Sequence, residues 1–382
     1  MDVEESAEHR QLRELVEDFT KKEIAPHAPK WDEAQEFPAA AFRRMGELGL
    51  LGVMIPSEYG GSGMDPYAAT IVMEELARSC AATSLSYGAH AVLCVANLHR
   101  NASEEQRKKF LPRLCDGSTM GAMAMSEPGA GSDSLGMRLR AERKGDQYVL
   151  NGTKLWITNA QVAGVFLVYA KTKEGRGRDA LSAFVVEKGT PGFSIGKKLD
   201  KMGMRASPTG ELIFEDCRIP VAHRLLEEGS GVQQMMRNLD VERITLSGIS
   251  LGIQRACLEV AARYASERKQ FEKPIGEFQM VQKMLADMAT ELEAARQLVY
   301  FAARKVQQHA EGMGSLAAKA KLFASECATR AGLWAIQILG GYGYTKEFPV
   351  ERYMRDAKLM EIGAGTSEIQ RMIIARDLLK QI

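Results

Sequence analysis

A glycine-rich segment at residues 127–133, EPGAGSD, has residue types that could hold a phosphate group. Glycine lets a backbone approach a ligand closely, and successive amide groups can bind a pyrophosphate. A plain loop between domains would have the same composition, because short glycine motifs often match by chance. The segment is therefore either a phosphate-binding loop or an ordinary connection.

A tryptophan lies in the middle of a second candidate segment, KLWITN at residues 154–159. On a β-strand, Trp156 could lie against a flat ring while the Thr158 hydroxyl bonds the edge of that ring. A tryptophan that packs in the core of a β domain is the simpler interpretation, and composition alone favours it.

Two more glycine-containing segments lie near the C-terminus. Residues 337–344, QILGGYGY, are typical of a helix that ends in glycines. Residues 363–368, GAGTSE, predict a helix start capped by Thr366 or Ser367. A helix N-terminus also accepts anions or ligand oxygens, so capping and binding are compatible.

Several common catalytic patterns are absent from the sequence. It has no G-x-x-x-x-G-K-[ST] loop, no G-x-G-x-x-G fingerprint after a strand and no G-x-S-x-G elbow. The six histidines form no H-x-x-x-H or H-E-x-x-H pair, which argues against a zinc hydrolase. We expect no metal site.

The elements that would position these segments fall into three parts. Helical patterns dominate at both ends of the chain, and short β-rich runs between turn signals dominate the middle. Strands spaced in this way predict an antiparallel barrel or sandwich. We predict a mostly helical α+β protein with an N-terminal helical domain at 1–120, a middle β domain at 121–230 and a C-terminal helical bundle at 231–382.

Local patterns give more specific expectations. Asn151-Gly152 predicts a hairpin turn between the β-rich runs 148–150 and 155–158. Gly312 and Gly314 predict a break between two long helices. The apolar stripe expected on the first helix is Leu12, Leu15, Val16 and Phe19, and the long helices expected near the C-terminus are 233–266, 277–310 and 315–339.

Composition and charge exclude several classes of protein. The 382 residues carry 50 Lys and Arg against 49 Asp and Glu, so the net charge of +1 argues against nucleic acid as a partner. Residues 79–99 lack Asp, Glu, Lys and Arg but contain several polar side chains, which favours a buried helix over a membrane span. The six cysteines form no C-x-x-C pair, so we expect reduced core thiols.

Taken together, these segments resemble the acyl-CoA dehydrogenase family of flavoproteins. The resemblance spans essentially the whole chain, and the motifs occur in the family's order. It implies non-covalent FAD, oxidation of the Cα–Cβ bond of an acyl-CoA and transfer of electrons to an electron-transfer flavoprotein. The matching segments are AMAMSEPGAGSD (122–133), KLWITN (154–159), RKQF (268–271), QILGGYGY (337–344) and GAGTSEIQ (363–370).

The resemblance also implies which carboxylate removes the α-proton. Many members carry a glutamate just before the G-T of the last motif, where this chain has Ala364. A subset places it in an E-R pair on a helix after the β domain, and NLDVER at 238–243 matches that subset, which implies Glu242 as the base. Glu361 and Glu368 are competing candidates, and an ordinary surface role for Glu242 is the alternative.

A finer resemblance is to the isovaleryl-CoA dehydrogenase subfamily. LSYGAH (85–90), KKLDKMGMR (197–205) and EIGAGTSE (361–368) carry it. The small Ala364 would leave room for a branch near the reacting carbons. Two departures weaken the match, because Glu272 replaces the usual glycine and the region around Gln233 differs. The resemblance implies conversion of isovaleryl-CoA to 3-methylcrotonyl-CoA.

The resemblance implies roles for individual positions. Arg268, Gln279 and residues 337–341 would reach the FAD of a neighbouring subunit, and the Ala364 amide would polarise the thioester carbonyl. The FAD-binding residues implied are Met123, Met125, Ser126, Gly131, Ser132, Trp156, Ile157, Thr158, Arg268, Phe271, Gln279, Gln337, Gly340, Gly341, Thr366 and Glu368. The substrate-binding residues implied are Ser132, Asp240, Arg243, Ala364 and Gly365.

The shared FAD site implies a homotetramer. We expect a bacterial cytoplasmic protein, because the acidic N-terminal segment has no signal or transit pattern, with a mature mitochondrial matrix form as the alternative. Three other functions stay open: a dehydrogenase of straight short- or medium-chain or cyclic carboxyl-CoAs, a flavin oxidase or monooxygenase on the same fold, and a binding protein without activity.

Overall fold

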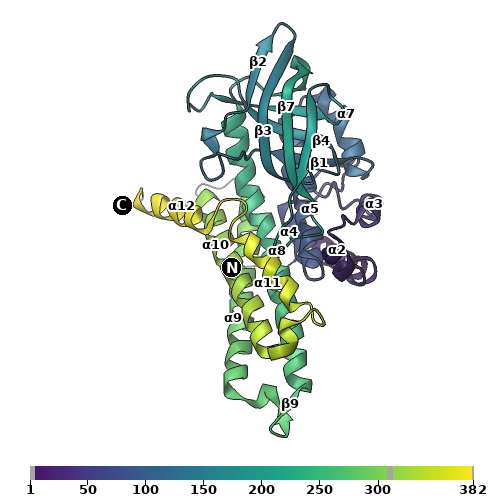
Figure 1. The fold of residues 1–382 in the computed structure, drawn as a ribbon, viewed down its shortest axis with the longest axis vertical. Coiled ribbons are helices and arrows are strands. Elements are labelled where there is room, and N and C mark those ends of the chain that lie inside the picture. The colour runs from purple at the N-terminus through teal and green to yellow at the C-terminus, as the bar shows by residue number, and fades with distance from the viewer. Residues whose placement is uncertain (1–4, 308–312, 381–382) are drawn as a thin grey trace.

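The computed structural model describes residues 5–307 and 313–380. The chain forms helices first, then a β-sheet, then long helices (Figure 1). Ser6, Asp65 and Ser103 cap three of the early helices by accepting a backbone N–H in the first turn. The early helices are α1 (Ala7–Phe19), α2 (Ala28–Ala34), α3 (Ala39–Glu47), α4 (Pro66–Ala77), α5 (Ala81–Gly88), α6 (Asn97–Asn101) and α7 (Glu104–Cys115).

The charge-free stretch at 79–99 is buried, as predicted. A π-helical segment, Ala89–Ala96, joins α5 to α6, and His90 within it accepts a hydrogen bond from Gly121 N at 2.8 Å. In the described part of the chain, no helix is long and apolar enough to span a membrane. All six cysteines are buried and unpaired, which agrees with the expected core thiols.

The middle of the chain forms a mixed sheet in the order β6-β7-β3-β2-β4-β5-β8, and β1 pairs with β4. Most pairings are antiparallel, as expected, but β1–β4 and β2–β4 are parallel. The strands are β1 (Met120–Ala124), β2 (Arg140–Lys144), β3 (Gln147–Thr158), β4 (Ala163–Lys171), β5 (Leu181–Glu187), β6 (Phe193–Lys198), β7 (Thr209–Pro220) and β8 (Arg224–Leu225).

The prediction of a hairpin turn at Asn151-Gly152 is wrong. Both residues lie inside β3, where the register with β7 shifts between Leu150 and Gly152. Gly152 has a φ of 137°, and a Cβ there would lie 3.0 Å from the backbone of Leu139. The glycine therefore serves a β-bulge with a close backbone approach, and β2 turns into β3 at Gly145 instead.

Long helices make up the rest of the molecule. They are α8 (Gly231–Glu267), α9 (Gln279–Gln307), α10 (Met313–Leu339), α11 (Val350–Met360) and α12 (Ser367–Leu379), with a short hairpin of β9 (Lys269–Gln270) and β10 (Lys273–Pro274) after α8. The three predicted long helices correspond to α8, α9 and α10. Of the predicted break, Gly312 and residues 308–311 lie outside the described residues, and Gly314 belongs to α10.

One hydrophobic core joins both helical parts of the chain. It includes Val16 of α1, Ile71 of α4, Ile249 of α8 and Val299 of α9. The predicted stripe on the first helix holds for Leu12, Val16 and Phe19, but Leu15 is 41% exposed. The buried face of α1 is narrower than predicted, because the helix buries only one side against α4 and Leu15 lies outside that side.

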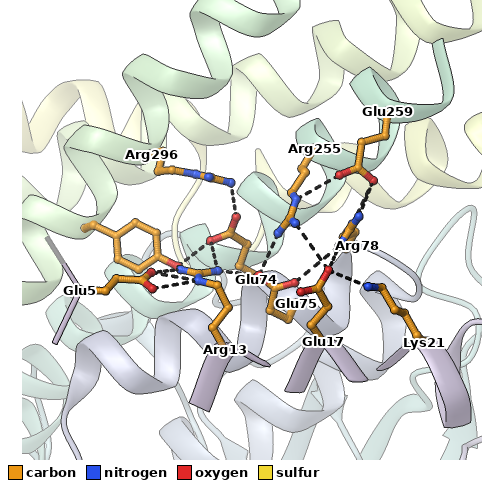
Figure 2. Close-up of polar contacts among 11 residues, drawn as sticks. Glu5, Arg13, Glu17, Lys21, Glu74, Glu75, Arg78, Arg255, Glu259 and Arg296 are labelled. Carbon is orange, nitrogen blue, oxygen red and sulfur yellow. Dashed lines mark hydrogen bonds and ion pairs between the residues drawn. The ribbon is translucent and has the colours of Figure 1, made fainter. Parts of the chain in front are cut away.

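A network of ion pairs reinforces the same junction (Figure 2). Glu74 and Glu75 of α4 are buried. Glu74 pairs with Arg13 of α1 at 3.3 Å and with Arg296 of α9 at 2.5 Å. Glu75 pairs with Arg13 at 2.5 Å and with Arg255 of α8 at 2.8 Å. The network therefore ties α1 and α4 to the C-terminal helices.

Candidate active site

Glu242 lies in the interior of α8 and is 7% exposed. Burial raises the pKa of its carboxyl to about 7, although the nearby charges of Arg243 and Lys321 act in the opposite direction. Its Oε2 atom is buried and receives no hydrogen bond from any residue in the described ranges. A carboxylate with this pKa and a free oxygen can accept a proton near neutral pH.

The turn between α11 and α12 meets α8 beside Glu242. Arg243 pairs with Asp240 at 3.1 Å, and its Nε donates to the carbonyl oxygen of Ala364 at 3.4 Å. Gln370 of α12 donates to the carbonyl oxygens of Ala364 and Gly365 at 3.2 and 2.9 Å. The structure thus brings Asp240, Arg243, Ala364 and Gly365 together with Glu242.

The two competing carboxylates have other partners. Glu361 accepts a hydrogen bond from Thr329 and pairs with Lys358 at 2.9 Å. Burial raises the pKa of Glu361, but these partners outweigh it and the net pKa is lowered. At the start of α12, backbone and Thr366 hydrogen bonds lower the pKa of the exposed Glu368. Both carboxylates are therefore weaker bases than Glu242.

Trp156 projects from the sheet instead of packing in the core. It has a φ of 66° at a point where the register of β3 with β7 shifts, and it is 59% exposed. The simpler interpretation of a core tryptophan is therefore wrong, because this bulge turns the side chain off the buried face. Its neighbour Ile157 is buried, and Thr158 ends the strand.

A buried ion pair fixes the segment after β1 against β3. Lys154 is fully buried, and its ammonium donates to Glu127 Oε1 at 2.9 Å and to the carbonyl oxygen of Met125 at 2.8 Å. Leu155 N donates to the carbonyl oxygen of Ser126 at 3.0 Å. These bonds hold Met125 and Ser126 next to the strand that carries Trp156.

The glycine loop after this segment is open. Gly131 and Ser132 are exposed, and a Cβ on Gly129 or Gly131 would meet no atom within 4 Å. Met123 of β1 connects this side to the base, since its sulfur lies 3.9 Å from the amide nitrogen of Asn238, one turn before Glu242 on α8. The sheet side and the helix side therefore border one region.

The remaining predicted FAD residues lie elsewhere in the chain. The hairpin at β9 is at the far end of the helices from β2 and β3 (Figure 1). Arg268 stacks over the Tyr342 ring at 5.9 Å, which brings it beside the turn with Gly340 and Gly341. Phe271 is 87% exposed. Gln279 begins α9, and Gln337 lies in the last turn of α10.

The last two predicted positions lie at the start of α12. Thr366 caps this helix by accepting a hydrogen bond from Ile369 N at 3.3 Å, as the sequence predicts. Glu368 is in the first turn. Both follow directly after the Ala364–Gly365 turn.

Sequence reasoning missed two buried lysines at this site. Lys154 lies in the KLWITN motif, which does not mark it as buried, and Lys321 lies in none of the motifs. Lys321 of α10 is 2% exposed and donates to the carbonyl oxygen of Gly365 at 2.8 Å. A signal was present, because Lys321 lies between Ala317 and Ala324 on a helical face that carries no other charged residue.

Comparison with known proteins identifies the family. The descriptions "Acyl-CoA dehydrogenase, N-terminal domain", "middle domain" and "C-terminal domain" match residues 6–118, 122–217 and 229–379. A probable acyl-CoA dehydrogenase of Bacillus subtilis is 48% identical, over 100% of both chains. Mitochondrial isovaleryl-CoA dehydrogenase of Pongo abelii is 47% identical, over 97% of this chain and 88% of the relative.

A solved structure agrees with these matches. Butyryl-CoA dehydrogenase from Megasphaera elsdenii superposes with a TM-score of 0.96 at 39% identity, over 99% of this chain and 100% of the other. The order of helices, sheet and helices described above is that of the matched domains. The chain therefore belongs to the acyl-CoA dehydrogenase family of FAD-dependent enzymes.

Proposed function

We propose that this enzyme dehydrogenates a short branched-chain acyl-CoA, isovaleryl-CoA to 3-methylcrotonyl-CoA, with Glu242 as the base. The observation that carries the assignment is the buried Glu242 carboxyl, with a free Oε2 and a pKa of about 7, beside the Ala364 turn. The position that would carry a carboxylate in many relatives is an alanine here. Glu242 supplies the missing group from α8.

The chain's own residues act on the substrate in two ways. Glu242 takes the α-proton as the Cα–H bond breaks. The Ala364 N–H donates to the thioester carbonyl and stabilises the negative charge that develops on its oxygen. FAD, when bound, supplies the acceptor for the hydride that leaves the β-carbon, so a C=C bond forms between the two carbons.

The residues on the sheet side suit a flavin. Exposed Trp156 offers a flat face, Thr158 adds a hydroxyl at the strand end, and the open Gly131 leaves space for a ligand. Met123, Met125, Ser126, Ser132 and Ile157 surround these positions along the chain. We assign these residues, with Thr366 and Glu368, to one side of the FAD site.

Arg268, Phe271, Gln279, Gln337, Gly340 and Gly341 form the second side, contributed by a neighbouring subunit. The distance between the β9 hairpin and the sheet in one chain supports this arrangement, because one cofactor would need two chains to touch both sides (Figure 1). We infer a homotetramer on this basis. Electron-transfer flavoprotein is the proposed acceptor, and the bacterial cytoplasm the proposed compartment, with the mitochondrial matrix as the alternative.

The proposed identity of the acyl group rests on a steric argument and on the names of the relatives. Ala364 has the smallest side chain that still carries a Cβ, which leaves room for the methyl branch of isovaleryl-CoA. The relative from Pongo abelii is named an isovaleryl-CoA dehydrogenase. Asp240, Arg243, Ser132 and Gly365 are the other proposed acyl-CoA contacts.

Anaerobic titration of the holoenzyme with a panel of acyl-CoAs tests the proposal. Isovaleryl-CoA should bleach the oxidised flavin band fastest. Fastest bleaching by butyryl-, hexanoyl- or a cyclic carboxyl-CoA would replace the substrate and keep the reaction. Rapid reoxidation of the reduced enzyme in air would indicate an oxidase or monooxygenase, and no bleaching by any acyl-CoA would indicate a binding protein.

A further inference from the structure

Lys321 is a buried cation on the wall of the candidate active site. Its side chain lies on the face of α10 that packs against α8, between Ala317 and Ala324. The ammonium donates to the carbonyl oxygen of Gly365 at 2.8 Å. Burial lowers its pKa to about 8, so the group is still protonated at neutral pH. A charged lysine in such a place needs acceptors and countercharge.

The turn that Lys321 holds is conformationally demanding. Ala364 has a φ of 56° and Gly365 a φ of 92°, so two consecutive residues are left-handed. A residue with a Cβ adopts this region at an energetic cost, and such a conformation persists only where its surroundings fix it. Arg243 and Gln370 hold the Ala364 carbonyl from one side, and the Lys321 bond to Gly365 is the shortest of the set.

The same ammonium also faces the proposed base. The charged and titratable groups around Glu242 are Arg243 on α8, Lys321 on α10 and Tyr169 on β4. Arg243 is already paired with Asp240. Lys321 itself faces Arg243, Glu361, Glu242 and Glu368. Arg243 and Lys321 each donate to a carbonyl of the turn, but Arg243 also has Asp240 as an ion-pair partner, whereas Lys321 forms no ion pair with any described residue. The charge of Lys321 is therefore the one left to act on the Glu242 carboxylate.

We propose that Lys321 is a positioning residue for the proton transfer: it fixes the Ala364–Gly365 turn through the Gly365 carbonyl and is the countercharge of the ionised Glu242. The inference rests on the proposed function, in which Glu242 takes the α-proton and the Ala364 N–H binds the thioester oxygen. One side chain would thus set both the place of the hydrogen-bond donor and the ionisation of the base.

A lysine with a purely structural role would stabilise the packing of α10 and the turn without changing the pKa of the base, Glu242. Lys321→Met separates the two cases, because it keeps a long unbranched side chain and removes the charge and the donors. Lys319→Met is the matched control, since Lys319 is exposed two residues away on the same helix. Lys321→Arg keeps a cation and N–H donors.

Two measurements are made on each holoenzyme. The first is the pH dependence of kcat/KM with isovaleryl-CoA, and the second is amide hydrogen exchange over residues 361–367. Loss of a nearby cation raises a carboxyl pKa. Lys321→Met should therefore shift the acid limb of the profile, where kcat/KM falls as the base is protonated, to higher pH by about one unit. Exchange in the turn should accelerate about tenfold. Lys319→Met should match the wild type in both.

The outcomes are distinct. An unchanged acid limb and unchanged exchange in Lys321→Met would overturn the inference. If Lys321→Met does not fold, Lys321→Arg decides: a wild-type limb supports the inference, and a limb displaced upward by about one unit contradicts it. If the wild-type enzyme oxidises no acyl-CoA but Lys321→Met still loosens residues 361–367, the proposed function fails while the role of Lys321 in the turn stands.

Discussion

Glu242 and Arg243 are consecutive on α8, yet their side chains have opposite surroundings. Arg243 pairs with Asp240 and donates to Ala364 O, whereas Glu242 Oε2 is buried and accepts no hydrogen bond within the described part of the chain. Arg243 therefore holds the turn, and Oε2 of Glu242 is available to accept a proton. The first two predictions follow from this difference in hydrogen bonding between two adjacent residues.

Replacing the base should stop turnover without removing the cofactor. Glu242→Gln keeps the size of the side chain but cannot take a proton, so we expect kcat to fall by about 10³–10⁴-fold with the flavin absorbance ratio unchanged. Steady-state rates with isovaleryl-CoA measure the loss. Glu14→Gln, an exposed change on α1, is the control. Turnover within tenfold of the wild type in Glu242→Gln would exclude this residue as the base.

The pH profile should carry the signature of the raised Glu242 pKa. The base acts only when it is ionised, so kcat/KM should be level above pH 7 and fall about tenfold per unit below it. Initial rates between pH 5.5 and 9 measure the profile. A profile that stays level down to pH 5 would mean that the proton acceptor has an ordinary carboxyl pKa.

The buried Lys154–Glu127 pair should stabilise the sheet side of the site. Among the described residues, Lys154→Met leaves the Glu127 carboxylate with only the amides of Arg138 and Leu139, so the free energy of unfolding should fall by about 3 kcal/mol. Urea unfolding measures the change. Lys144→Met removes an exposed ion pair and should cost less than about 0.5 kcal/mol. Equal effects of the two changes would contradict the role of burial.

A shared cofactor predicts complementation between two defective chains. Trp156→Ala and Arg268→Ala should each lower FAD content, because each damages a different side of the same site. Co-expression gives mixed pairs with one intact site, and about a quarter of all sites should regain flavin. Absorbance of the purified mixture measures this recovery. Failure to recover any flavin would place both residues on one chain's site, or neither on it.

The network around Glu74 should contribute measurably to stability. Glu74→Ala removes the buried partner of Arg296 and one of the two buried carboxylates that pair with Arg13, and we expect a loss of about 3 kcal/mol in the free energy of unfolding. Thermal and urea unfolding measure it. Asp18→Ala breaks the exposed pair with Lys22 and serves as the control. A loss below about 0.5 kcal/mol for Glu74→Ala would show that the network adds nothing beyond surface pairs.

The sequence predicts the layout of this fold better than its local exceptions. Helical periodicity locates α8, α9 and α10, because their apolar faces are long enough for the 3.6-residue repeat to be unambiguous. Asn151-Gly152 has hairpin chemistry but serves a bulge, since the neighbouring strand β7 continues past it and offers pairing partners on both sides. Pairing between distant strands overrides a local turn signal.

The candidate site, like the fold, could be predicted from the sequence only in part. The motif residues were accessible to sequence reasoning because they carry characteristic types in a fixed order. The helical pattern around Lys321 marks a buried lysine, but its partner could not be predicted, because the bond depends on the approach of the turn at Gly365, 44 residues further along the chain. Trp156 likewise could not be placed, since a strand residue points in or out according to a bulge that no local pattern marks.

The core shared by α1, α4, α8 and α9 bears on how such proteins can be recombined. Residues 6–118 match a family domain of their own, yet their apolar face and the acids Glu74 and Glu75 are completed by α8 and α9. A chimera that exchanges this segment between two relatives would have to carry over Arg255 and Arg296 as well. The segment is thus not a transplantable module, because its buried acids find their partners on helices that lie outside it.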